Sequence, residues 1–243
     1  MNTRNYSKEP YSILCFGDSN TWGCIPMWEE SAEVSARYPW GVRWTSILQE
    51  NLGYRARVIE EGLGGRTTLR ELPKPNGEGK LKVAEPFLPV CLLTNRPVDM
   101  VILMLGTNDL HLPICPTEET LGEGVRKLIH IIDEEKKAWN GDKRPQVLLI
   151  APPRLEKAKG RTGLWRNFGE NGLQLSEQFG ETYRRVALEE QVDFLDAGAY
   201  IGPSEADGIH LTAEAHFVLG EEITKKVEEI LEREQISLAI SPK

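Results

Sequence analysis

An unbroken run of six apolar residues at positions 100–105, with the sequence MVILML, is the feature that most constrains the fold of this chain. A strand that faces water on one side alternates apolar and polar residues, whereas a strand covered on both faces is apolar throughout. The run therefore predicts a central strand of a buried parallel sheet. We expect four further strands in this sheet, at residues 11–16, 56–60, 146–151 and 192–195.

Helical patterns separate these strands. The clearest follows Thr117, whose hydroxyl can cap a helix N-terminus. Its apolar stripe, at a period of about 3.6 residues, consists of Leu121, Val125, Leu128, Ile129 and Ile132. Further helices are expected at 42–52, within 81–94 where Pro86 and Pro89 interrupt the pattern, at 175–190 and at 213–232. Alternating strands and helices predict a three-layer α/β fold, with a central five-stranded parallel sheet in a flavodoxin-like order.

Composition and charge exclude several classes of function. The chain has 29 Lys and Arg against 37 Asp and Glu, which argues against a nucleic-acid partner because such proteins carry a concentrated basic surface. Residues 1–10 lack the apolar stretch of a signal peptide, and no apolar run approaches the roughly 18 residues of a membrane span. The four cysteines form no C-x-x-C pair. We therefore expect a cytoplasmic protein with reduced thiols and no membrane partner, folded as one domain over residues 1–243 with its core at about 11–232.

A serine follows the first expected strand in a glycine-flanked turn. Residues 17–23 read GDSNTWG, directly after the apolar residues of that strand. Ligands of open α/β sheets bind at the carboxyl ends of the strands, so this turn would deliver the Ser19 hydroxyl to a site. The same residues are also typical of an ordinary turn or helix start. Cys24 is a rival nucleophile in the same loop, but it has no local histidine partner in the sequence.

A serine nucleophile needs an imidazole base and a carboxylate that orients it, and the chain has only four histidines. His130 and His216 lie in expected helices and are interpreted as structural. His111 follows the turn after the central strand and is a candidate for contact with substrate. His210 lies three residues after Asp207 with a glycine between them, so the carboxylate can fold back onto Nδ1 while Nε2 faces the serine. We predict His210 as the base and Asp207 as its partner.

Two alternatives to this assignment stay open in the sequence. Asp207 and the glycine after it are also typical of a plain turn before a capped helix. Asp196, after the fifth expected strand, is a competing carboxylate, which we interpret as a residue that structures its loop. A comparison of variants at the two positions would separate them.

Acyl transfer also requires hydrogen-bond donors for the oxyanion of the tetrahedral intermediate. Three donors follow three of the expected strands: the backbone N–H of Ser19, the backbone N–H of Gly65 and the side-chain amide of Asn108. The glycines at 64 and 65 permit a close approach of the backbone. With the glycine at 62 they also suggest a dinucleotide-binding loop, but the third spaced glycine and the following acidic residue of that motif are absent.

Together these motifs resemble the four sequence blocks of the SGNH hydrolases, also called the GDSL esterase/lipase family. The matching residues, in order, are Gly17-Asp18-Ser19, Gly65, Gly106-Thr107-Asn108-Asp109 and Asp207-x-x-His210. Details similar to the arylesterase and acyltransferase branch of the family are Thr21-Trp22-Gly23, Arg66-Thr67-Thr68 and Ala151-Pro152-Pro153. The resemblance covers about residues 11–220, and four blocks in order are far more specific than any one of them.

This resemblance implies a flavodoxin-like sheet, the SGNH hydrolase fold, and a serine esterase mechanism that requires no metal or organic cofactor. Ser19 would be the nucleophile, His210 the base and Asp207 its orienting acid. Gly65 and Asn108 would be the oxyanion donors. Members of this branch act on small esters, some pass the acyl group to alcohols or peroxide, and several are homo-oligomers.

We therefore expect a homo-oligomeric serine carboxylester hydrolase that acts on short-chain acyl or aryl esters through an acyl-enzyme, with acyltransferase or perhydrolase side activity. A carbohydrate O-deacetylase or a thioesterase would use the same machinery on another leaving group. A binding module that keeps the fold without turnover is a third reading, although such a protein has no need of Ser19, Asp207 and His210 together.

Other positions are assigned more specific places around this site. Trp22, three residues beyond the nucleophile, is assigned to the pocket wall, with packing as the alternative. Gly64 departs from the branch, in which serine is frequent at this position. Residues 154–172 have no pattern that matches the branch, and we interpret them as a mobile flap or an oligomer contact.

Overall fold

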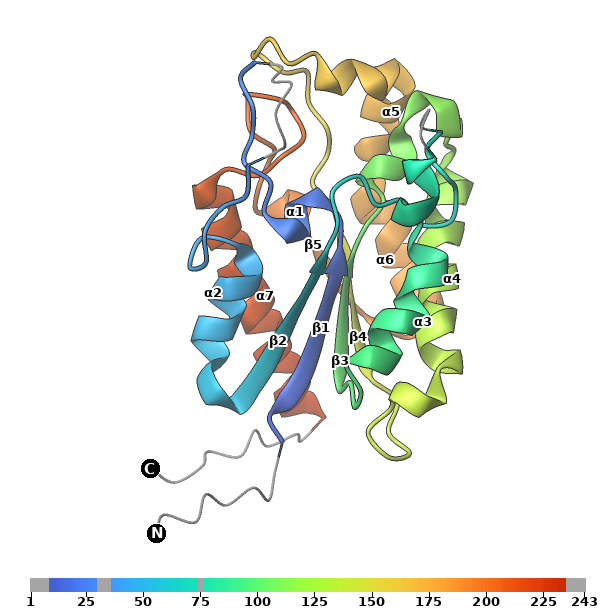
Figure 1. Ribbon diagram of the computed structural model, residues 1–243, viewed down its shortest axis with the longest axis vertical. Coiled ribbons are helices and arrows are strands. Elements are labelled where there is room, and N and C mark those ends of the chain that lie inside the picture. The colour runs from blue at the N-terminus through green and yellow to red at the C-terminus, as the bar shows by residue number, and fades with distance from the viewer. Residues whose placement is uncertain (1–8, 30–35, 74–76, 235–243) are drawn as a thin grey trace.

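The computed structural model describes residues 9–29, 36–73 and 77–234 of the chain. At its centre is a sheet of five parallel strands in the order β2-β1-β3-β4-β5 (Figure 1). The strands are β1 (Tyr11–Gly17), β2 (Ala56–Gly62), β3 (Met100–Met104), β4 (Gln146–Ala151) and β5 (Asp193–Asp196). The predicted flavodoxin-like sheet of five parallel strands is confirmed.

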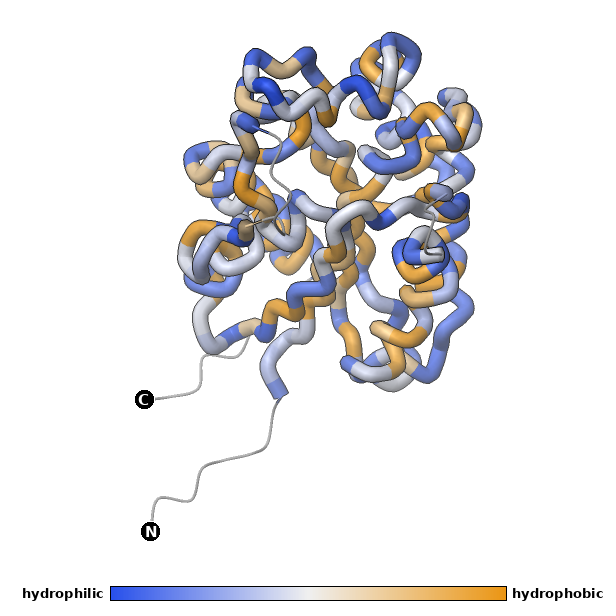
Figure 2. The backbone as a smooth tube through the Cα atoms, turned by 45° about the horizontal axis from the view of Figure 1, so that its top comes forward, coloured by the Kyte–Doolittle hydropathy of each residue, from blue (hydrophilic) through white to orange (hydrophobic). Residues whose placement is uncertain are grey.

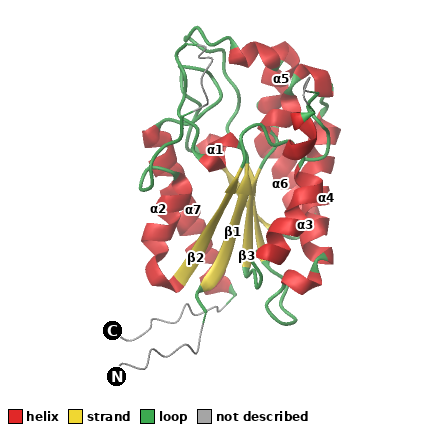
Figure 3. Cartoon of the chain, viewed as in Figure 1, coloured by secondary structure: helices red, strands yellow, loops and turns green. Residues whose placement is uncertain are grey.

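Helices cover both faces of this sheet (Figure 3). On one face lie α2 (Trp44–Leu52) and α7 (Ala213–Arg233), which pack against each other. On the other lie α3 (Ala84–Thr94), α4 (Glu118–Glu134) and α6 (Phe179–Glu189), as Figure 1 shows. The expected three-layer architecture is thus confirmed. No helix in the described part of the chain combines the length and the apolar character needed to span a membrane.

The central strand β3 shows why the sequence run is apolar throughout. Val101 and Leu103 belong to the core on the side of α3, α4 and α6. Met100, Ile102 and Met104 belong to the core on the side of α2 and α7. Because successive side chains of a strand point to opposite faces, both sets must be apolar when both faces are covered. Figure 2 shows the apolar positions gathered along the strands.

The N-terminus of α4 forms as its sequence predicts. Thr117 Oγ1 accepts a hydrogen bond from the Thr120 backbone N–H at 3.2 Å, and Thr120 Oγ1 accepts one from the Thr117 N–H at 2.9 Å. This reciprocal cap satisfies two N–H groups that lack partners at the start of a helix. All five residues of the expected apolar stripe are buried on α4.

The prediction that two prolines interrupt the helix within residues 81–94 is wrong. Because α3 begins at Ala84, Pro86 occupies the first turn, where a backbone N–H has no partner within the helix. Pro89 lies inside the helix and removes one backbone donor. Leu88 and Leu92 are fully buried on the same helix, and this packing holds the segment helical despite the lost hydrogen bond.

The helix expected at residues 175–190 is confirmed over α6, but its beginning is wrong, because residues 175 and 176 belong to a separate helix, α5 (Gly169–Ser176). At the junction, the N–H groups of Glu177 and Gln178 donate to carbonyls three residues back, at 3.3 and 3.0 Å. Such bonds form a tighter turn than the α-helix. Buried apolar residues continue on both sides of the junction, so the sequence pattern conceals the break.

Candidate active site

Three turns that carry predicted site residues lie side by side at one edge of the sheet. Strand β1 pairs with both β2 and β3, and Gly17 at its end is in register with Gly62 on one side and Met104 on the other. The connection after β1 leads to β2 and the connection after β3 leads to β4, in opposite directions along the sheet, and open α/β sheets bind ligands where this direction reverses. The turns after these strands contain Ser19, Gly65 and Asn108.

The turn after β1 becomes the short helix α1 (Ser19–Trp22), which begins at the serine itself. The Asp18 carboxylate accepts a hydrogen bond from the Asn20 backbone N–H at 2.9 Å and caps the turn. Position 62, on strand β2 next to α1, must be glycine, because a Cβ at Gly62 would lie 2.2 Å from the Trp22 backbone nitrogen. The close packing of β2 under α1 therefore fixes the position of the Ser19 backbone.

The structure brings Ser19, His210 and Asp207 together in one chain of contacts. His210 Nε2 lies 3.1 Å from Ser19 Oγ, and His210 Nδ1 lies 2.7 Å from Asp207 Oδ2. Asp207 is fully buried, and its other oxygen accepts the backbone N–H groups of Ile209 and His210 at 3.0 and 2.9 Å. Gly208 permits this tight loop: its φ is +73°, and a Cβ there would lie 1.9 Å from the Glu156 carbonyl oxygen.

The electrostatics of this pair favour the charged imidazolium form of His210. Burial alone would lower the pKa of His210, but the hydrogen bond that His210 donates to Asp207 and the proximity of Cys24 outweigh it and raise the pKa to about 10. Burial alone would raise the pKa of Asp207, yet the hydrogen bonds from His210 and from backbone N–H groups hold it below its usual value. In its neutral form His210 can accept a proton from Ser19, and Asp207 stabilises the resulting cation.

Buried hydrogen bonds link the candidate oxyanion donors to each other. The Asn108 amide nitrogen donates to the Arg66 carbonyl oxygen at 3.1 Å, and so ties the β3 turn to the residue after Gly65. Asp109 accepts bonds from the backbone N–H of Thr68 at 2.9 Å and from its hydroxyl at 2.6 Å. Burial raises the pKa of Asp109 to about 6, although the Thr68 bonds oppose the shift. These contacts fix the distance between the Gly65 backbone and the Asn108 side chain.

A cavity of about 510 Å³ opens at this edge of the sheet. Its wall includes the predicted residues Ser19, Gly65, Asn108, Trp22, His111 and His210. Sequence reasoning missed other parts of the wall, which are Met27, Leu63, Leu72, Gly79, Lys82, Leu164, Asn167, Phe168 and Ile209. A space of this size is typical of small-molecule sites.

Part of the segment 154–172, for which the sequence shows no pattern, forms one side of this cavity. Leu164, Asn167 and Phe168 line it, and the Phe168 ring packs against the His111 ring with centroids 4.3 Å apart. Phe168 itself is buried. No local signal could predict this contact, because the two aromatic residues come from distant parts of the chain.

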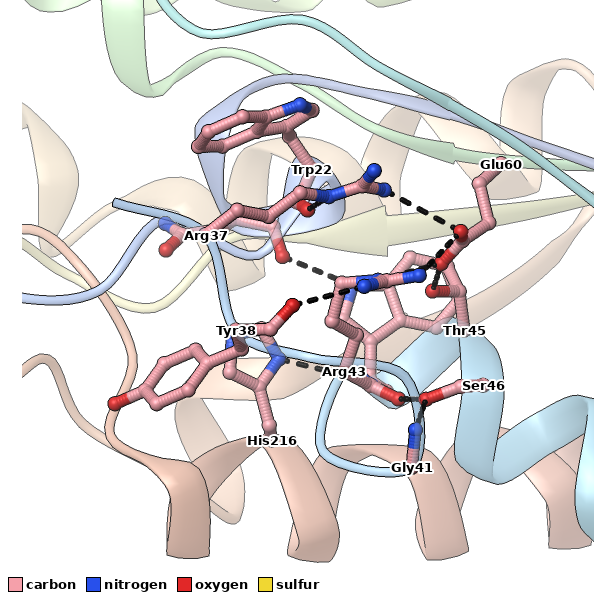
Figure 4. A network of polar contacts seen from close by, with 11 residues as sticks. Trp22, Arg37, Tyr38, Gly41, Arg43, Thr45, Ser46, Glu60 and His216 are labelled. Carbon is pink, nitrogen blue, oxygen red and sulfur yellow. Dashed lines mark hydrogen bonds and ion pairs between the residues drawn. The ribbon is translucent and has the colours of Figure 1, made fainter. Parts of the chain in front are cut away.

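The side chain of Trp22, on another side of the cavity, is anchored by a polar network (Figure 4). Arg37 Nε donates to the Trp22 carbonyl oxygen at 2.6 Å, and its guanidinium lies 5.3 Å from the indole centroid. Arg37 and Arg43 both pair with Glu60, at 3.3 and 2.7 Å. Burial raises the pKa of Glu60, but the hydrogen bonds from Arg43 and Thr45 and the charges of Arg43 and Arg37 together hold it below its usual value. Strand β2, through Glu60, thus supports the wall that Trp22 forms.

The structure leaves three sequence candidates outside this cavity. His130, on α4, pairs through Nε2 with the Glu190 carboxylate at 2.8 Å. His216 is fully buried, and its Nδ1 accepts the Trp44 backbone N–H at 3.3 Å. Burial and the nearby Arg43 lower the pKa of His216 to about 4. Asp196 accepts the backbone N–H two residues later at 3.0 Å and lines a different cavity, in agreement with its interpretation as a loop residue.

The sequence argument against Cys24 is corrected in one respect, because the fold supplies the histidine partner that the sequence lacks locally. The Cys24 backbone N–H donates to the Ser19 carbonyl oxygen at 2.9 Å. Its side chain lines the same cavity and is near enough to His210 to help raise the pKa of that imidazole. His210 therefore contacts both a hydroxyl and a thiol, although the thiol is the less exposed of the two.

Comparisons with known proteins find similar sequences and similar solved structures. The model of the GDSL-like Lipase/Acylhydrolase family matches residues 15–217. Est24, a carbohydrate acetylesterase from Sinorhizobium meliloti, is 33% identical with a TM-score of 0.82, over 90% of this chain and 99% of that one. The aryl esterase of M. smegmatis is 34% identical with a TM-score of 0.81, over 91% of this chain and 100% of that one. A comparison with curated proteins finds no match.

Proposed function

Because the chain belongs to the GDSL-like lipase/acylhydrolase family and is a carboxylic ester hydrolase, we propose that it hydrolyses short-chain acyl or aryl esters through an acyl-enzyme on Ser19. The observation that carries this proposal is the contact chain at the cavity wall, with 3.1 Å from Ser19 Oγ to His210 Nε2 and 2.7 Å from Nδ1 to Asp207. This is the spacing that proton transfer from a serine nucleophile requires.

Each step of the proposed reaction has a residue in place. Ser19 Oγ attacks the ester carbonyl carbon while His210 Nε2 takes the hydroxyl proton and Asp207 stabilises the cation. The N–H groups of Ser19 and Gly65 and the amide of Asn108 stabilise the oxyanion. His210 then returns the proton to the departing alcohol. Water, activated by the same imidazole, releases the acid; an alcohol or peroxide in its place would give acyltransferase or perhydrolase side activity.

The cavity favours short acyl chains. Its volume of about 510 Å³ must hold both sides of the ester, and the rings of Trp22, His111 and Phe168 form part of its wall. We expect kcat/KM for p-nitrophenyl esters to be highest for acetate or butyrate and to fall at least about tenfold for the dodecanoate, since a longer chain must stay in water. Equal kcat/KM for acetate and dodecanoate would contradict the limit on chain length.

A carbohydrate O-deacetylase is the second candidate. It is favoured by the 33% identity to Est24, which is described as a carbohydrate acetylesterase. Release of acetate from an acetylated monosaccharide, from phenyl acetate and from phenyl thioacetate at matched concentrations separates a deacetylase, an aryl esterase and a thioesterase. The leaving group with the highest kcat/KM identifies the class, because all three substrates carry the same acyl group.

The raised pKa of His210 predicts an alkaline pH profile. Only the neutral imidazole can take the Ser19 proton, and the pKa of about 10 means that the neutral fraction grows as pH rises. We expect kcat/KM for a neutral ester to rise from pH 6.5 to at least about pH 8.5, by as much as tenfold per unit. The uncatalysed alkaline hydrolysis of the ester is subtracted. A plateau that begins near pH 6.5 would show that His210 is not held as the cation.

A further inference from the structure

The cavity contains a cationic side chain to which the proposed reaction assigns no role. Among the described residues that line it, the ionisable basic ones are Lys82, His111 and His210, and Lys82 is the one primary amine. Lys82 is partly buried and lies alongside Gly65, the candidate oxyanion donor. A Cβ built at Gly65 would lie 3.3 Å from Lys82 Cδ and 3.4 Å from its Nζ. The ammonium group is therefore close to where the ester carbonyl would bind.

The backbone of Lys82 is tied to the same loop that carries Gly65. The Lys82 carbonyl oxygen accepts the Thr67 N–H at 3.0 Å, and the Thr67 carbonyl oxygen accepts the Ala84 N–H at 2.9 Å. Thr67 and Val83 form a parallel β-bridge between these bonds. The chain that precedes α3 is thus fixed to the loop after β2, and Lys82 keeps its place beside the cavity.

Within the described ranges, no carboxylate pairs with the Lys82 ammonium group. Several surface lysines pair with carboxylates; Lys157 lies 2.7 Å from Glu170, and Lys225 lies 2.6 Å from Glu222. By contrast, no ion pair joins Lys82 Nζ to a carboxylate of the described residues, and the lining drawn from those residues includes no Asp or Glu. An unpaired ammonium beside mostly apolar walls is a site for an anion.

We propose that Lys82 binds an anionic substituent of the ester, so that the preferred substrates carry a carboxylate a few bonds from the reacting carbonyl. This inference rests on the proposed function, because it places the ester in the same cavity. A carboxylate on either the acyl or the alcohol side has the same chemistry, and matched substrates distinguish the two. The neutral alkyl and aryl esters commonly used as assay substrates would then underestimate the activity.

The test compares esters that differ only in this charge. Mono-p-nitrophenyl succinate and p-nitrophenyl butyrate have acyl chains of similar length, and 4-acetoxybenzoate and phenyl acetate form the matching pair on the alcohol side. We expect the wild type to favour the anionic member of one pair. Lys82→Met should lower kcat/KM for that member by about tenfold or more, mainly through KM, because a charge-assisted hydrogen bond is lost. The neutral member should keep its kcat/KM, and added salt should weaken the preference.

Lys80→Met is the matched control, because Lys80 lies in the same short turn (Glu78–Lys82), is exposed and carries the same charge. It should leave the preference intact. An equal loss for charged and neutral esters in Lys82→Met would place the ammonium at the oxyanion and overturn the inference, as would a wild type without any anionic preference. Turnover of the neutral esters, lost in Ser19→Ala, reports separately on the proposed function.

Discussion

Replacement of Ser19 by alanine should lower kcat for p-nitrophenyl acetate by about a millionfold, to the background rate, since loss of a serine-protease nucleophile has an effect of this order. The Ser19 side chain is small and its turn is held by Asp18 and by the packing of Gly62, so alanine fits without rearrangement. The assay is initial-rate release of p-nitrophenol by wild type and variant, with equal thermal unfolding curves to show that both are folded. Allowing for background, a loss of at least about a thousandfold supports the assignment.

Cys24→Ala provides the control for this result. The thiol lines the same cavity and contacts His210, so it is the alternative nucleophile that the structure offers. We expect Cys24→Ala to retain turnover, and an organophosphonate to label a wild-type peptide at Ser19. Full activity in Ser19→Ala together with an inactive Cys24→Ala would transfer the nucleophile to the thiol and contradict our proposal.

Replacement of Asp207 by asparagine should lower kcat by about 10⁴-fold, the effect of the equivalent change in a serine protease. Asparagine keeps the shape of the side chain but has no charge to stabilise the imidazolium. Its amide can also leave the imidazole in the wrong tautomer, since Asp207 Oδ2 lies 2.7 Å from Nδ1 and Oδ1 already accepts two backbone N–H groups. The measurement is kcat for p-nitrophenyl acetate above the alkaline background.

Asp196→Asn is the matched control, because it makes the same chemical change in the carboxylate that competes in the sequence. Asp196 accepts a backbone N–H in its own loop, so activity should change little. The pH profile gives a second readout: without Asp207 the pKa of His210 falls, and the acidic limb of any residual activity should move to lower pH. An Asp196 variant that loses more activity than the Asp207 variant would reverse the assignment.

The sheet and the turns at its edge could be predicted from the sequence because their signals are local. Buried strands are continuous apolar runs, and the residues that follow β1, β2 and β3 have glycine-rich turns that a strand end requires. Parallel strands end at one edge, so Ser19, Gly65 and Asn108 had to be near one another once the strand order was flavodoxin-like. His210 could be predicted as the base because the chain has only four histidines.

The limits of local reasoning appear where packing overrides propensity. Two prolines did not interrupt α3, because buried leucines hold it against the sheet. The break between α5 and α6 was missed because apolar residues are buried on both sides of a turn with tight backbone bonds. In both cases the hydrophobic pattern records burial, while the path of the backbone depends on the neighbouring elements.

The sequence by itself determined the strands, their turns and the residue types that acyl transfer needs, since each depends on a few consecutive positions. Only the tertiary structure decided the cavity: Phe168 meets His111, Cys24 meets His210, and Lys82 meets Gly65. These contacts join segments that are distant in the chain, and no periodicity or turn pattern specifies which distant side chains share a wall. The class of reaction can therefore be predicted from local motifs, whereas substrate preference depends on how the folded chain brings separate loops together.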